Sequence, residues 1–337
     1  MAAEVSIIIV NWNGRDLLRR CLESISSSPF DVAYEVIVID NASQDNSLEL
    51  LRKSQASSRL IDEGRLKIVE NVENRGFGAA NNQAFDLAQS PLIFLLNPDT
   101  ELLPDAPNQL IKTIRSDRRI GACGPRILNP DGSLQISVWH APPKAWQILL
   151  SNLKLYRLLP QRLRGELLLG GHWQHDRRRP VPMLSGAAIL ARREMIEEVG
   201  GFDERFHVYG EDNEWCWRIR QAGWQLVFEP TATIIHHGGE SAKQRWSGLE
   251  KLQVKMEASY LFEQHALPRW RLIANQLAYY LTSSLQKAWY RLSGDRRPDV
   301  ELAQKIHREH LKRSRTRTNS SRPPTAKVTN VPATHED

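Results

Sequence analysis

The sequence contains few cysteines and no long apolar run. Only three of its 337 residues are cysteines, Cys21, Cys123 and Cys216, and they lie too far apart for a metal-binding or redox motif. We therefore expect packed thiols in a reducing compartment, the cytoplasm. No stretch of about 18 uninterrupted apolar residues occurs, which argues against a membrane-spanning helix. The first residues lead directly into a strand pattern, so we expect no signal peptide.

Acidic residues are scarce near the C-terminus. The chain carries 45 Lys and Arg against 39 Asp and Glu, which gives a formal net charge of +6. Ten basic residues but only three acidic ones lie between Arg296 and Lys327. This distribution predicts that the tail meets an anionic surface, and we expect a membrane and no nucleic acid as the partner.

No G-x-G-x-x-G motif follows the first strand, which argues against a nicotinamide-binding domain. The chain instead alternates apolar strands with segments in which apolar residues recur at helical spacing. The predicted strands are Val5–Val10, Glu35–Asp40, Leu66–Val69 and Leu92–Leu96. This alternation predicts an α/β fold with a mostly parallel sheet between helices, within residues 1–245.

The later part of the chain has a different pattern. Residues 125–137 predict a hairpin that turns at Asn129-Pro-Asp-Gly132. Residues 138–180 form an amphipathic basic insertion, which either packs on the protein or lies on a membrane face. Residues 246–311 predict a helical extension, and the Ser/Thr/Pro/Arg-rich residues 312–337 predict a disordered basic tail.

Polar residues follow the fourth strand, at the edge where open α/β sheets bind their ligands. Asn97-Pro98-Asp99 ends this strand, because proline has no N–H to donate within a sheet. Asp99 is therefore a candidate ligand-binding residue, with a helix cap or a turn as the alternative. Glu211 and Asp212 begin a later helix, where capping alone is again the alternative.

Seven segments, taken in order, resemble an inverting GT-A glycosyltransferase of family 2, in its rhamnosyltransferase-like branch. The resemblance covers residues 4–245. The segments are Val5–Gly14, Val38–Ser43, Asn74–Asn82, Asn97–Asp99, Ser185–Ala188, Glu211–Arg218 and His236–Ser241. Each motif is unspecific alone, whereas their common order is specific. The resemblance implies a Rossmann-like GT-A domain that transfers a sugar from a nucleotide donor.

The resemblance implies that the first loops hold the nucleotide. The residues it assigns to the nucleoside and ribose are Val10, Asn11, Asp40, Asn41, Asn74, Arg75, Gly76 and Asn82. Asn41 stands where many relatives have a second acid. Its side-chain carbonyl can still accept a hydrogen bond from a pyrimidine N3–H.

The resemblance also implies a divalent cation, Mg²⁺ or Mn²⁺, on the donor diphosphate. Asp99 is the ligand it assigns, and Asn97, where the family has an acid, assists as a neutral group close to the nucleotide. His236 fits the His-x-Gly-Gly pattern and would complete the ligand set, which favours Mn²⁺. His237, or a purely structural histidine, is the alternative.

Asp212 is the catalytic base that the resemblance assigns, and Glu211 beside it raises the proton affinity of the pair. The residues assigned to the donor and acceptor sugars are Ser185, Gly186, Ala187 and Trp215. Two positions depart from the family pattern. Glu214 stands where an Asp is common, and Val181-Pro182-Met183 where Val-Asp-Trp is common.

Three functions are consistent with these residues. The first is transfer of L-rhamnose from dTDP-rhamnose to a glycan or polyprenyl-linked glycan in cell-surface polysaccharide synthesis. The second keeps the chemistry but uses a UDP- or GDP-hexose. The third is a sugar-nucleotide-binding partner without turnover, against which the presence of Asp99, Asp212 and His236 argues. We expect a cytoplasmic protein, held peripherally at the inner face of the plasma membrane.

Overall fold

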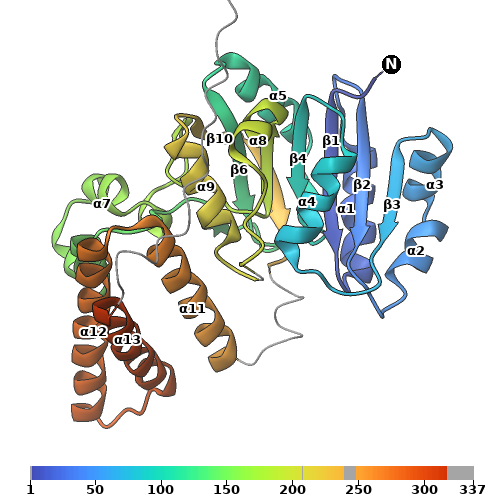
Figure 1. Ribbon diagram of the computed structural model, residues 1–337. Helices are drawn as coiled ribbons and strands as arrows, with labels where there is room; N and C mark the ends of the chain where they lie inside the picture. The colour runs from blue at the N-terminus through green and yellow to red at the C-terminus, as the bar shows by residue number, and fades with distance from the viewer. Residues whose placement is uncertain (1, 207, 239–247, 317–337) are drawn as a thin grey trace, which may run out of the picture.

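A mixed β-sheet with helices on both faces forms the body of the protein. The computed structural model describes residues 2–206, 208–238 and 248–316 (Figure 1). The strands of this part of the chain are β1 (Val5–Asn11), β2 (Tyr34–Asp40), β3 (Leu66–Glu70), β4 (Leu92–Leu96), β5 (Thr100–Leu102), β6 (Ile120–Leu128), β7 (Leu134–Gln135), β8 (Arg179–Pro180), β9 (Ala188–Arg192) and β10 (Gln225–His236). They form one sheet in the order β3-β2-β1-β4-β9-β6-β10-β5, with β7 beside β6 and β8 beside β10.

The helices of the described residues are α1 (Arg15–Ser27), α2 (Ser47–Lys53), α3 (Gln55–Asp62), α4 (Phe77–Leu87), α5 (Ala106–Ser116), α6 (Ala145–Asn152), α7 (Gln161–Leu168), α8 (Arg193–Val199), α9 (Glu211–Gln221), α11 (Gly248–Ala266), α12 (Arg269–Leu292) and α13 (Pro298–Thr316), with 3-10 turns η1 (Leu155–Leu158) and η2 (Gly170–His172). Two apolar layers lie between the sheet and the helices that cover its two faces. Leu22 of α1 and Ile114 of α5 belong to one layer, and Ala84 of α4 and Trp215 of α9 belong to the other.

The predicted α/β fold is confirmed. β1 pairs in parallel with both β2 and β4, and β2 pairs in parallel with β3. Continuous apolar strands such as Leu92–Leu96 suit this position, because both faces of a central strand are covered. Two features lie outside the prediction: β9 runs antiparallel to both of its neighbours, and β5 is a three-residue strand that pairs antiparallel with β10. The three cysteines are buried and unpaired, as predicted.

The predicted hairpin is also present. β6 and β7 pair antiparallel, and the N–H of Gly132 donates to the carbonyl of Asn129 across the turn. The strand β6 has nine residues and continues to Leu128. This length carries β7 and its Gln135 toward the end of β10, which matters for the site described below.

Three helices, α11 to α13, follow the sheet (Figure 1). The last of them runs to Thr316, so the predicted disorder does not begin at residue 312. Ser314 explains the extension, since it is buried and its hydroxyl lies 3.2 Å from the hydroxyl of Tyr260 in α11. Residues 317–337 lie outside the described residues. Within the described chain, no helix combines the length and the apolar character that crossing a membrane requires.

The insertion at residues 138–180 packs on the sheet domain, through residues such as Trp173, and on α12. The side chain of Asn152 donates to the hydroxyl of Thr282, and Gln286 donates to the carbonyl of Asn152. The opposite side of the insertion remains open to solvent, because Leu158 is 83% exposed. The structure therefore shows packing on one side of this segment and leaves an apolar surface on the other.

Candidate active site

A cavity of about 310 Å³ opens at the ends of the central strands. Its described walls are Val10, Trp12, Asn41, Asn74, Gly76, Phe77, Asn97, Pro98, Asp99, Ser185, Gly186, Ala187, Val208, Tyr209, Glu211, Asp212 and His236. Most of the predicted site residues are among them. The predicted residues that do not line the cavity are Asn11, Asp40, Arg75, Asn82 and Trp215. The aromatic walls Trp12, Phe77 and Tyr209 were not predicted, since an isolated aromatic carries no signal in the sequence.

Asp99 reaches the cavity because β4 stops abruptly. The N–H of Asn97 donates to the carbonyl of Ala187, and the N–H and hydroxyl of Thr100 both donate to the carbonyl of Asn97. These bonds hold the segment around Pro98 in a tight turn before β5. The turn places Asp99 on the cavity wall, as the strand-end position predicted.

His236 faces Asp99 at the end of β10. Its Nε2 lies 3.2 Å from Asp99 Oδ1, while its Nδ1 lies 2.5 Å from Gln135 Oε1. The amide nitrogen of Gln135 donates to Asn129 Oδ1, so the orientation of this amide is set by its own partners. Because Gln135 Oε1 can only accept a hydrogen bond, Nδ1 of His236 carries the proton that it donates to this oxygen. In the neutral ring, Nε2 then has a lone pair that points toward Asp99.

His237 points elsewhere. Its Nε2 lies 2.7 Å from Glu101 Oε1, and its backbone N–H donates to the carbonyl of Asp99. The two histidines, which the sequence did not distinguish, thus differ in the structure: only His236 lines the cavity.

The polar atoms around Asp99 fit a divalent cation held jointly by the protein and a ligand. Asn97 Oδ1 and His236 Nε2 are both buried, and neither has a hydrogen-bond partner among the described residues. A carboxylate oxygen and an imidazole lone pair 3.2 Å apart repel each other unless a proton or a metal lies between them. The described residues contain no group of three or more His, Cys, Asp or Glu that would cage an ion alone. Such a cation would therefore need phosphate oxygens to complete its ligands.

Asp212 and Glu211 enter the cavity from the first turn of α9. The helix begins after Tyr209 and Gly210, which have positive φ angles of 65° and 88°. The N–H of Gly186 donates to Asp212 Oδ2 over 3.2 Å, and the N–H of Asn213 donates to Asp212 Oδ1 over 2.8 Å.

The environments of the two carboxylates differ. Burial, and then the charge of Asp212, raise the pKa of Glu211 to about 8. Its Oε2 is buried without a hydrogen-bond partner among the described residues. Burial also raises the pKa of Asp212, but the N–H groups of Gly186 and Asn213 offset part of this effect. Glu211 is therefore the member of the pair that keeps a proton near neutral pH, and Asp212 is the one whose charge the two N–H groups stabilise.

Asn41 does more than line the cavity. Its Oδ1 accepts hydrogen bonds from Asn71 Nδ2 and from the N–H of Arg75, and its Nδ2 donates to Asn74 Oδ1 and to the carbonyl of Gly76. The expected bond from its carbonyl to a pyrimidine N3–H conflicts with this arrangement, because both lone pairs are in use. Asn41 instead holds the segment 74–76 against the site.

Asn11 and Asp40 lie at the ends of β1 and β2 and hold the loops that follow these strands. Asn11 Nδ2 donates to Asp40 Oδ1, and the N–H and hydroxyl of Ser43 donate to the same carboxylate. Both residues are buried. Neither residue lines the cavity, and their mutual hydrogen bond shapes the loops that carry Val10 and Asn41. Their predicted contact with the nucleoside stays a prediction.

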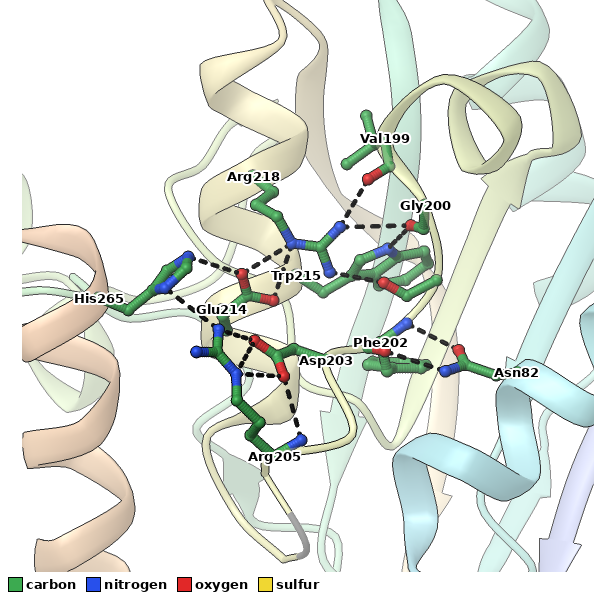
Figure 2. A network of polar contacts seen from close by, with 11 residues as sticks. Asn82, Val199, Gly200, Phe202, Asp203, Arg205, Glu214, Trp215, Arg218 and His265 are labelled. Atoms are coloured by element: carbon green, nitrogen blue, oxygen red, sulfur yellow. Dashed lines mark hydrogen bonds and ion pairs between the residues drawn. The ribbon is translucent and has the colours of Figure 1, made fainter. Parts of the chain in front are cut away.

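Asn82 and Trp215 do not line the cavity, in contrast to most of the other predicted residues. Asn82 forms two hydrogen bonds with the backbone of Phe202 (Figure 2). The indole N–H of Trp215 donates to the carbonyl of Gly200, and its ring is fully buried against Phe202. Each side chain holds the loop before α9 to the body, and neither one is free to contact a sugar.

Glu214 connects α9 to the C-terminal helices. Its carboxylate accepts hydrogen bonds from Arg218 and lies 3.3 Å from Nε2 of His265 in α11 (Figure 2). Arg218 also donates to the carbonyls of Val199 and Gly201. Burial raises the pKa of Glu214, but the hydrogen bonds from His265 and Arg218 outweigh it, so the pKa is lowered overall. This residue connects α9 to α11.

Comparisons with known proteins identify the family of this chain. The family model for glycosyl transferase family 2 matches residues 6–200. The chain is 27% identical over 259 residues to an N-acetylglucosaminyl-diphospho-decaprenol L-rhamnosyltransferase of Mycobacterium tuberculosis, covering 72% of this chain and 78% of the relative. It is 28% identical to the O-antigen biosynthesis protein RfbC of Myxococcus xanthus, covering 79% of this chain but 19% of that protein.

Two solved structures share the fold. The mannosyltransferase PcManGT of Pyrobaculum calidifontis, in complex with GDP-Man and Mn²⁺, gives a TM-score of 0.51 at 16% identity and covers 94% of this chain and 86% of its own. GalNAc-T7 with UDP, GalNAc and Mn²⁺ gives 0.55 at 18% identity, covering 91% of this chain and 55% of its own. The fold is that of the GT-A glycosyltransferases, as predicted. The chain belongs to glycosyl transferase family 2, in its rhamnosyltransferase-like branch.

Proposed function

We propose that this glycosyltransferase inverts its donor sugar in a single displacement, with Asp212 as the base. The observation that carries the proposal is the arrangement of the cavity. Asp212 enters it from α9, and the Asp99–His236 pair enters it from the ends of β4 and β10. A base and a diphosphate-binding corner are what an inverting transfer needs on the walls of one site.

The proton moves to Asp212. The acceptor hydroxyl loses its proton to this carboxylate while the hydroxyl oxygen attacks the anomeric carbon, and the nucleoside diphosphate leaves from the opposite face. Glu211 keeps its proton at neutral pH, because its pKa is raised to about 8, and is therefore not the acceptor of this proton. The N–H donors of Gly186 and Asn213 keep the carboxylate of Asp212 oriented for the transfer.

Asp99 and His236 would hold Mg²⁺ or Mn²⁺, which when bound neutralises charge on the leaving diphosphate. Gln135 fixes the ring of His236 through Nδ1 and so leaves Nε2 as the ligand atom. Asn97 contributes an uncharged oxygen at the same corner. The solved neighbours contain Mn²⁺ with a sugar nucleotide or with UDP, which supports this role.

The donor we propose is dTDP-rhamnose and the acceptor a glycan or polyprenyl-diphosphate-linked glycan, in cell-surface polysaccharide synthesis. The name of the mycobacterial relative supports both parts. A UDP- or GDP-hexose is the second candidate, since the solved neighbours hold GDP-Man and UDP. A panel of dTDP-, UDP- and GDP-sugars tests the choice: nucleoside diphosphate release with a lipid-linked acceptor should be fastest with dTDP-rhamnose. If no sugar nucleotide of the panel released nucleoside diphosphate, catalysis would be rejected, and a sugar-nucleotide-binding protein without turnover would remain.

We also propose that the enzyme sits peripherally on the inner face of the plasma membrane. The outer side of α12 presents large apolar residues, with Trp270 71% exposed and Trp289 70% exposed. Arg269, Arg271 and Arg291 belong to the same helix. Apolar residues together with cations are typical of a surface that binds anionic lipid without crossing the bilayer.

A further inference from the structure

A second cavity, of about 490 Å³, adjoins the first across Asp212. The two cavities share Ser185, Tyr209, Asp212 and His236 as lining residues. Asp212 therefore faces both spaces. In a displacement the acceptor must approach the anomeric carbon from the side opposite the leaving group, with its hydroxyl at the base. If the nucleotide occupies the first cavity, the acceptor enters through the second.

The helix α11 lines the second cavity with two basic residues. Lys251 and Lys255 lie one turn apart on α11, which packs against α9 (Figure 1). Within the described residues neither lysine forms a salt bridge with a carboxylate, and the ammonium of Lys255 lies 4.9 Å from the centre of the Tyr209 ring. Burial, and then the charge of Lys251, lower the pKa of Lys255. Two cations this close, without an acidic partner, are stabilised when an anion binds between them.

The same cavity is lined by an aromatic residue. The indole N–H of Trp139 donates to Asn213 Oδ1 over 2.9 Å, which fixes the half-buried ring beside the start of α9. Asn213 is the residue directly after the base, and it also lines this cavity. An aromatic residue near the base gives an apolar surface for a sugar ring, in the cavity that the two lysines also line.

We propose that the second cavity binds the acceptor and that Lys251 and Lys255 recognise a phosphate or diphosphate on it. The acceptor sugar lies against Trp139 with its hydroxyl at Asp212. The inference rests on the proposed function for the position of the donor, and it adds the anionic chemistry of the acceptor and the residues that recognise it.

The test is binding of undecyl diphosphate to the full chain by calorimetry. EDTA is present, so that the diphosphate cannot bind through a metal at Asp99 and His236. Wild type should bind, and a Lys251→Gln/Lys255→Gln variant should bind about 10- to 100-fold more weakly. Lys251→Arg/Lys255→Arg should retain most of the affinity. The matched control, Lys287→Gln/Lys312→Gln, removes the same charge outside the cavity and should bind like wild type.

Two further arms identify the source of the anion. Inorganic pyrophosphate binding as tightly as undecyl diphosphate would support a soluble phosphorylated acceptor, and tighter binding of the tailed compound would support a lipid-linked one. Absence of binding by wild type, or equal binding by wild type and the Lys251→Gln/Lys255→Gln variant, would overturn the proposal. Donor turnover is measured separately, so that failure of the enzymatic function is distinguishable from failure of the anion site.

Discussion

The sheet domain and the C-terminal helices differ in the large apolar residues that they leave at the surface. In the sheet domain the interior is apolar, with β-branched strands such as Val5–Asn11 between two helical layers. In the helices α11 to α13 the interior holds Glu263, Asn275 and Gln276, while Trp270 and Trp289 face solvent. The sheet domain uses apolar burial for stability. The helices bury apolar residues such as Leu272 as well, but α12 leaves several large apolar side chains at the surface, which indicates that its outer side has a partner.

The largest expected effect concerns the site itself. Asp212→Asn removes the proton acceptor and should lower kcat by about 10²- to 10⁴-fold while donor binding is retained. Glu211→Gln is the matched variant, and it should lose far less activity, because Glu211 is already protonated at neutral pH. Steady-state rates together with calorimetry of nucleotide binding measure both. If Glu211→Gln were the more damaged enzyme, the roles of the two carboxylates would have to be exchanged.

Next in size is the loss of metal-dependent binding. Asp99→Ala or His236→Ala should weaken Mn²⁺-dependent binding of nucleoside diphosphate on the order of 100-fold, because the cation loses one of its protein ligands. His237→Ala removes a neighbouring imidazole that points at Glu101 and should leave the metal dependence unchanged. Titrations with and without Mn²⁺ give the comparison. Equal losses for the two histidine variants would reject His236 as the ligand.

The buried Glu263 of the C-terminal helices predicts an unusual dependence of stability on pH. Burial raises the pKa of Glu263 to about 7, although hydrogen bonds from Gln276, Asn275 and Tyr279 oppose the shift. The folded state therefore holds this proton more tightly than the unfolded chain, and stability falls as pH rises from about 4.5 to 7. Glu263→Gln should raise the free energy of unfolding by about 2–3 kcal/mol at pH 8 and change it little near pH 4.

Glu214 provides the contrasting case, at the junction of the two regions. Its pKa is lowered in the folded protein, so its contribution is present above the pKa of the unfolded chain and is lost as pH falls through the folded pKa. Glu214→Gln should therefore destabilise the protein at pH 8 by about 1–2 kcal/mol. Denaturant unfolding at two pH values measures both glutamate variants. A stability gain for each of them at pH 8 would contradict this assignment.

The smallest expected effect is on lipid binding. Trp270→Ser/Trp289→Ser should lower binding to phosphatidylglycerol vesicles about 10-fold, and high salt should lower the binding of wild type. Ile61→Ser/Val72→Ser removes exposed apolar residues from the sheet domain and serves as the control. Sedimentation with vesicles gives the bound fraction. Equal binding by the two variants would mean that the outer side of α12 is not the lipid contact.

The sequence alone determined the order of strands and helices, the strand end that carries Asp99, the helix start that carries Asp212, and the family. These features depend on local patterns, because apolar periodicity and a proline at a strand end act within a few residues. The hairpin at Asn129 was predictable for the same reason.

Only the tertiary structure decided which side chains share a cavity. Asn82 and Trp215 lie within matching motifs, yet their partners Phe202 and Gly200 hold them away from the site. The sequence does not distinguish His236 from His237. In the structure their partners differ: His236 contacts Gln135, about a hundred residues earlier in the chain, and His237 contacts Glu101 on β5. The antiparallel direction of β9 likewise depends on pairing with β4 and β6. Contacts of this kind join distant segments, and no local pattern of residue types encodes which partner a buried polar group will find.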